Sequence, residues 1–118
     1  MSDLEALVDG WLSLPEVAER LGLDIVRTRH LLRERKLVAV RRGGNGVLCV
    51  PAAFVAGDGT VLKGLPGTLT VLADNGYAAD EAIRWLFTPD DSLPGTPVQA
   101  LAGDRGTEVK RRAQALGF

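Results

Sequence analysis

The sequence predicts a mainly α-helical fold with one small β-hairpin. Two short helical segments are separated by a three-residue turn, and two β-type runs around a glycine-rich turn follow directly. In the later half, helical periodicity alternates with proline and glycine breaks. These features predict a winged helix-turn-helix followed by a C-terminal helical bundle. We place the domains at residues 1–56 and 60–118, with the boundary at Gly57-Asp58-Gly59.

The first two helices are predicted from apolar spacing and capping residues. Apolar residues at helical spacing predict a helix from Asp3 to Trp11. Ser13 then stands at an N-cap, with Glu16 three residues later and Pro15 just inside the helix. We expect that helix to end at Leu21, because Gly22 accepts the left-handed conformation that closes many helices.

A further helix is predicted over residues 25–36, with Asp24 as its N-cap. Its spacing turns Thr28, Leu31 and Leu32 inward and leaves the basic residues on the outer face. Gly22-Leu23-Asp24 is the short turn expected between the two helices of a helix-turn-helix.

The hairpin is predicted from two β-type runs, 37–42 and 47–50, around Gly43-Gly44-Asn45-Gly46. Pro51 ends the second run and starts a short helix through Val55. In the second half we expect four helices, over residues 66–75, 79–87, 97–102 and 107–116.

The charge distribution is more informative than the net charge of −1. From Arg20 to Val50 there are eight basic residues and two acidic ones, an excess of six positive charges that the acidic remainder offsets. A nearly neutral chain can therefore present one positive face to a polyanion such as duplex DNA.

Several classes of protein are not expected. The single cysteine excludes a disulfide scaffold and a multi-cysteine zinc site. We find no signal peptide and no apolar run of membrane-spanning length, so we expect a cytoplasmic location. With one histidine, no phosphate-binding loop and no metal motif, the sequence predicts no enzymatic activity, no cofactor and no metal.

The predicted site is a recognition helix, 25–36, beside a basic wing, 37–50, that together read double-stranded DNA. Early helix positions reach base edges, later ones contact phosphate, and the wing follows the backbone. The predicted DNA-binding residues are Ile25, Val26, Arg27, Arg29, His30, Arg33, Arg35, Lys36, Arg41, Arg42 and Asn45.

The stretch from Ser13 to Phe54 resembles the winged helix-turn-helix of excisionase-like and MerR-like domains. The whole chain resembles a small actinobacterial (mycobacterial-type) family of winged-helix DNA-binding proteins, known as substrates of a serine/threonine kinase. KGLPGTLTVLADNGY and EVKRRAQALGF are distinctive parts of that resemblance. It implies a DNA-binding transcriptional regulator with no catalytic residues and a kinase as a partner.

In that family the phosphorylated threonine lies in an N-terminal extension. This chain has no threonine before Thr28, and only Ser2 carries a hydroxyl ahead of Ser13. We therefore do not expect kinase control through such an extension here.

The second half leaves two interpretations open. WLFTPDDSLPGTPVQAL is similar to the C-terminal module of certain antitoxins, which makes a protein-interaction module the alternative function. The other interpretation is that this half braces the wing and the first helix, burying apolar surface that a small domain cannot bury alone. The sequence does not indicate the oligomeric state.

Overall fold

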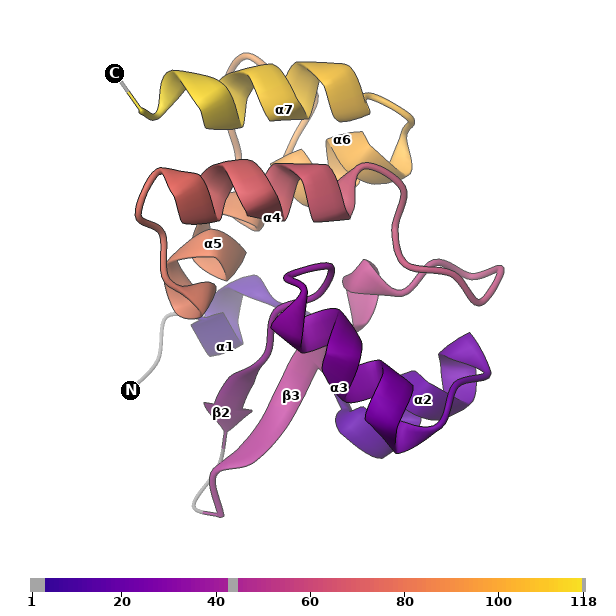
Figure 1. The fold of residues 1–118 in the computed structure, drawn as a ribbon. Coiled ribbons are helices and arrows are strands. Elements are labelled where there is room, and N and C mark those ends of the chain that lie inside the picture. The colour runs from indigo at the N-terminus through magenta and orange to yellow at the C-terminus, as the bar shows by residue number, and fades with distance from the viewer. Residues whose placement is uncertain (1–3, 43–44, 118) are drawn as a thin grey trace.

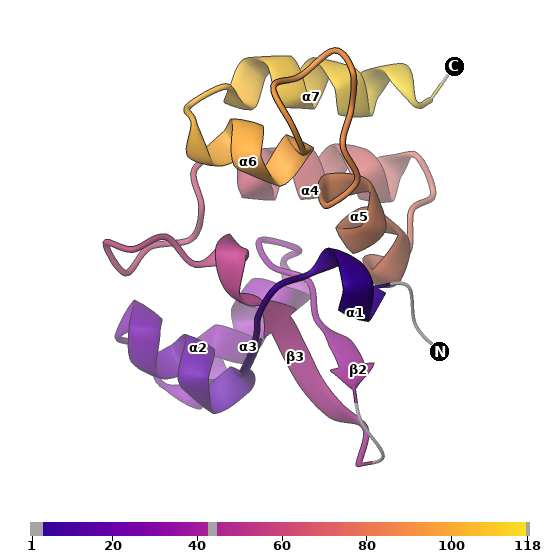
Figure 2. The same ribbon diagram turned by 180° about the vertical axis from the view of Figure 1, so that it is seen from behind.

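The computed structural model describes residues 4–42 and 45–117 (Figures 1 and 2). The first half holds a helix-turn-helix and a small sheet, and the second half packs on it as a group of helices. The elements are α1 (Leu4–Leu7), β1 (Trp11–Ser13), α2 (Leu14–Leu21), α3 (Ile25–Arg33), β2 (Val40–Arg42), β3 (Val47–Pro51), a 3-10 turn (Ala52–Phe54), α4 (Leu65–Asp74), α5 (Ala79–Leu86), α6 (Pro97–Ala102) and α7 (Gly106–Ala115). This architecture confirms the predicted fold class.

The helix-turn-helix forms through the capping residues that the sequence carries. The Ser13 side chain accepts a hydrogen bond from the backbone N–H of Glu16 at 3.3 Å, and the Glu16 carboxylate accepts one from the N–H of Ser13 at 2.8 Å. Gly22 closes α2 with a φ of 68°, which glycine adopts without a steric penalty. Asp24 caps α3 by accepting the N–H of Arg27 at 2.8 Å.

The sheet has three strands, in the order β1-β3-β2, and both pairings are antiparallel. The prediction that Trp11 ends a helix is wrong, because α1 stops at Leu7 and Trp11 pairs with Pro51 in the ladder. Pairing with β1 satisfies the second edge of β3 and buries Leu12 opposite Val50. The predicted tip residues Gly43 and Gly44 lie outside the described residues.

The recognition helix was predicted through Lys36 but ends at Arg33. Arg35 takes the left-handed conformation, with a φ of 61°. Its N–H donates to the carbonyl of Leu32 at 3.2 Å, and the N–H of Lys36 donates to the carbonyl of Leu31 at 2.9 Å. These two bonds are a Schellman motif, which stops the helix by satisfying its last carbonyls.

The second half shares one apolar core with the first. That core runs from Leu4 and Leu12 through Phe54 to Leu86 and Val109. The four predicted helices of this half form with ends within one residue of the expected ones, and α4 and α7 lie side by side (Figures 1 and 2). Their packing on the first half supports a bracing role.

Two contacts illustrate how the halves meet around this core. Helix α5 packs against α1. The rings of Phe54 and Phe87 meet with their centroids 5.9 Å apart. None of the helices within 4–42 and 45–117 is both long enough and apolar enough to cross a bilayer.

Candidate nucleic-acid interface

One buried polar residue shows which side of α3 faces the core. Thr28 is fully buried, and its hydroxyl donates to the carbonyl of Asp24 at 2.9 Å. At 3.6 residues per turn, Val26, His30 and Arg33 lie on the side opposite Thr28, with Arg27 and Arg29 on the two flanks. The face opposite the core is therefore basic along most of the length of the helix.

Two apolar side chains begin this face. Val26 is 59% exposed and Ile25 is 39% exposed, so both side chains present apolar surface to solvent. Both belong to the first turn of α3, the part of a recognition helix that reaches base edges in a major groove. Their exposure leaves apolar surface available for a thymine methyl group.

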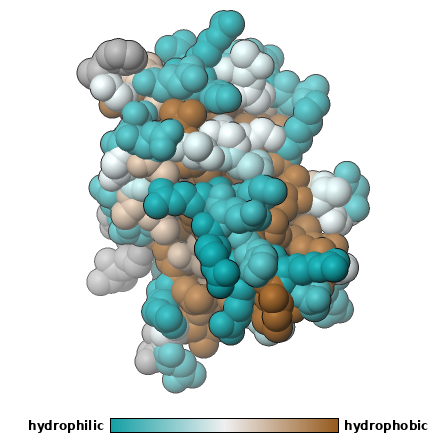
Figure 3. Space-filling model, viewed as in Figure 1, coloured by the Kyte–Doolittle hydropathy of each residue, from teal (hydrophilic) through white to brown (hydrophobic). Residues whose placement is uncertain are grey.

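The cations of this face are exposed and unengaged. In the described part of the chain, no acid pairs with the side chains of Arg27, Arg29 or Arg33. Figure 3 shows hydrophilic side chains gathered over α3. Unpaired cations that share one surface attract polyanions more strongly than cations neutralised by neighbouring acids.

The hairpin adds a second element beside α3 (Figure 1). Arg41 is exposed, and its guanidinium donates to the carbonyl of Gly46 across the turn at 2.8 Å. That bond holds the Arg41 side chain along the hairpin and leaves other donors of the guanidinium for an anion. Asn45 is exposed at the same end of the hairpin.

Arg42, predicted as a wing contact, is engaged elsewhere. Its guanidinium donates to Glu5 at 3.0 Å and lies 4.5 Å from the centre of the Trp11 ring. Only 29% of the Arg42 side chain is exposed. Strands alternate their side chains between two faces, so neighbouring Arg41 and Arg42 point to opposite sides of the sheet. Arg42 thus fastens the wing to α1, and its predicted contact with DNA stays a prediction.

The end of α3 also separates two further predicted residues from the outer face of the helix. Because the helix stops at Arg33, Arg35 and Lys36 do not continue its basic face. Arg35 lines a cavity against the second half. Lys36 lies 3.9 Å from the carboxylate of Glu34, and both side chains are exposed.

The roles of Glu5 and Trp11 could not have been found from the sequence. Glu5 lies 37 residues before Arg42, and no local pattern links the two. The groups with clearly shifted ionisation lie in caps and turns, away from α3. Local hydrogen bonds to Ser13, Thr60 and Ser92 lower the pKa values of Glu16, Asp58 and Asp90 respectively.

Two helices joined by a short turn and followed by an antiparallel hairpin define a winged helix-turn-helix protein. Comparison with known families then identifies the family to which this winged helix-turn-helix protein belongs. Residues 4–55 match the family model "DNA-binding protein Rv2175c, wHTH domain", and residues 62–117 match "Rv2175c C-terminal domain of unknown function". The chain belongs to the Rv2175c family.

The relatives agree in sequence and in fold. The chain is 46% identical over 117 residues to "DNA-binding protein Rv2175c" of Mycobacterium tuberculosis, covering 89% of this chain and 79% of the relative. The NMR structure of Rv2175c matches with a TM-score of 0.83 at 43% sequence identity. That match covers 92% of this chain and 82% of the solved one.

Proposed function

We propose that this protein is a transcriptional regulator that binds duplex DNA, with α3 in the major groove and the β2–β3 hairpin on the flanking backbone. The observation that carries the proposal is the outer face of α3, where unpaired arginines surround the exposed Val26. The relative's description as a DNA-binding protein supports the same function.

The residues of this surface divide by expected role. Arg27 and Arg29, near the start of α3, contact base edges, and an arginine–guanine pair discriminates by roughly 1–3 kcal/mol. Arg33 and Arg41 contact phosphate and set the register of the protein on the duplex. The proposed DNA-binding surface is Ile25, Val26, Arg27, Arg29, His30, Arg33, Arg41 and Asn45.

The test begins with selection from random duplex oligonucleotides at fixed salt, followed by anisotropy titrations of the full chain between about 50 and 200 mM salt. We expect Arg27→Ala to change the preferred sequence. We expect Arg33→Ala to weaken binding to all sequences and to lower the log–log salt slope by about 0.9.

Arg111→Ala is the matched control, because Arg111 is also an exposed helical arginine but lies on α7 in the second half. It should leave both the preferred sequence and the salt slope unchanged. Equal DNA affinity of the wild type and an Arg27/Arg29/Arg33 triple alanine variant would refute the proposed surface.

A protein-interaction function for the second half has weaker support. Leu65, Leu69, Leu72 and Ile83 of this half are buried in the core shared with the first half, so they are not available to a partner. Control by a kinase, and the likeness to excisionase and MerR-like domains, stay predictions.

A further inference from the structure

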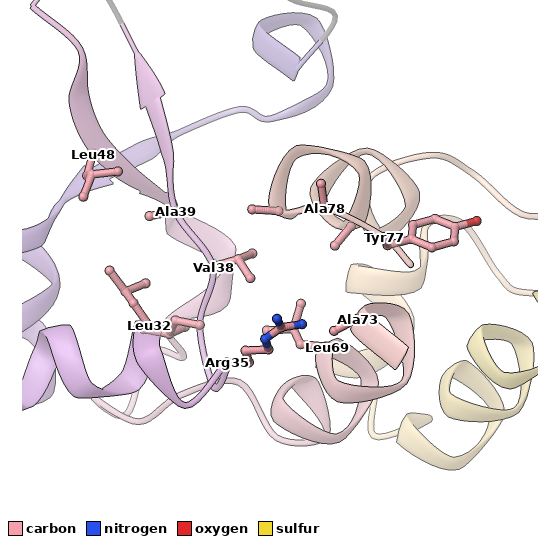
Figure 4. A pocket seen from close by; sticks show the side chains of 12 residues that line it. Leu32, Arg35, Val38, Ala39, Leu48, Leu69, Ala73, Tyr77 and Ala78 are labelled. Carbon is pink, nitrogen blue, oxygen red and sulfur yellow. The ribbon is translucent and has the colours of Figure 1, made fainter. Parts of the chain in front are cut away.

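A cavity of about 310 Å³ lies in the seam between the two halves (Figure 4). Its walls come from the end of α3, the segment leading to β2, strand β3, and helices α4 and α5. Sites for small molecules range from about 300 to 1,000 Å³, so this cavity suits a small ligand. Because Leu32 of α3 and Leu69 of α4 both line it, a ligand here would touch both halves.

Most lining side chains are apolar, although polar atoms also form a substantial part of the exposed walls. Alanine, valine and leucine contribute nearly all of the lining side chains. Among the described residues that line it, Arg35 alone carries a charge, and the hydroxyl of Tyr77 points away from the cavity (Figure 4). Figure 4 shows the Arg35 guanidinium in the opening, between Val38 on one side and Leu69 and Ala73 on the other.

Arg35 has no anionic partner of its own. No acid in residues 4–42 or 45–117 pairs with its guanidinium. The adjacent cation differs, because Lys36 lies near Glu34. An arginine at the mouth of a cavity presents a planar set of N–H donors. Two of these donors can bind the two oxygens of one carboxylate in a bidentate pair.

The backbone conformation of Arg35 sets the direction of its side chain. Arg35 occupies the left-handed position of the Schellman motif, with a φ of 61°. Glycine is the usual residue there, because a Cβ is strained in this conformation. Asp104 closes α6 in the same conformation, with a φ of 64°, so the conformation serves to end the helix. The side chain placed at this position is the guanidinium at the cavity.

We propose that the cavity binds a small monocarboxylate with an apolar body. The carboxylate pairs with Arg35, and the body lies against Leu32, Leu48, Leu69 and Ala82. A neutral molecule of the same shape leaves the guanidinium without a partner, and a cationic one is repelled by it. The inference goes beyond the proposed DNA-binding function and does not depend on it.

The probe for the test is octanoate, with octanol as the neutral analogue of equal chain length. Calorimetric titration of the full chain should detect octanoate binding and should show octanol binding at least about tenfold more weakly. Arg35→Gly keeps a residue suited to the left-handed backbone and removes the guanidinium. This variant should lose about tenfold or more in octanoate affinity.

Two further variants complete the design. Lys36→Gln removes the neighbouring cation, which does not line the cavity, and should leave octanoate affinity within about twofold of the wild type. Ala73→Phe fills the cavity and should abolish binding while the circular dichroism spectrum stays native. No octanoate binding up to about 5 mM, equal affinity for octanol, or undiminished affinity in Arg35→Gly would each overturn the proposal.

Discussion

Replacing Arg42 with alanine should destabilise the fold rather than remove a DNA contact. The guanidinium over Trp11 contributes about 0.5–1 kcal/mol as a cation–π pair at a partly exposed site. The pair with Glu5 adds about 0.5 kcal/mol or less, because 55% of the Glu5 side chain is exposed and solvent screens the charges. The Nε of Arg42 is buried and has no hydrogen-bond partner among the described residues, which offsets part of this gain.

These terms give a loss of about 1 kcal/mol in the free energy of unfolding. For a chain of 118 residues, the entropy of unfolding near the midpoint is about 250 cal/mol/K. The melting temperature should therefore fall by about 4 °C in a thermal unfolding experiment. Glu5→Gln, alone and combined with Arg42→Ala, should show that only part of the loss comes from the ion pair.

The DNA-binding measurement distinguishes this role from a phosphate contact. Arg42→Ala should keep the salt slope of the wild type, whereas Arg41→Ala, the neighbouring and exposed cation, should lower it by about 0.9. An Arg42→Ala variant with an unchanged melting temperature and a slope lowered by about 0.9 would show that our reasoning about the sheet face is wrong.

Four other substitutions test the local geometry of the helix-turn-helix and of the residues that end it. Thr28→Val keeps the volume but removes the hydroxyl bonded to the Asp24 carbonyl, and should cost about 1 kcal/mol in denaturant unfolding; an unchanged midpoint would contradict the role of that bond. Ser13→Ala removes the cap of α2 and should cost about 1 kcal/mol. The pKa of Glu16 is lowered in the folded chain. The ionised carboxylate therefore stabilises the fold above the ordinary glutamate pKa, and this stabilisation is lost as the pH falls through the lowered pKa. Glu16→Gln should remove this loss of stability at acidic pH, as measured by urea unfolding at several pH values. Arg35→Gly relieves a left-handed residue and should stabilise the chain by about 0.5–1 kcal/mol, so a lower melting temperature would contradict strain at this position.

The local elements could be predicted because their signals lie close together in the chain. Ser13 and Glu16 begin α2, Gly22 ends it and Asp24 begins α3, each through bonds that span three or four residues. The inward position of Thr28 follows in the same way from helical spacing. These interactions join residues that are close in the sequence, so local patterns could predict them.

Features that depend on residues far apart in the sequence could not be predicted from local patterns. The third strand requires Trp11 to meet Pro51, and the anchor of Arg42 requires Glu5 and Trp11 to arrive beside the wing. A helix signal around Trp11 therefore gave the wrong assignment, because an unpaired edge of β3 was available to the chain at that point.

The sequence by itself determined the helix-turn-helix, the hairpin and the basic character of their surface, since these follow from periodicity, caps, turn residues and charge count. Only the tertiary structure decided which cations share that surface. Packing the second half against the first placed Arg35 at a cavity, and pairing β1 with β3 placed Trp11 under Arg42. The physical reason is that the sequence gives the charge of each residue directly. The partner of that charge depends on contacts between segments that lie far apart in the chain.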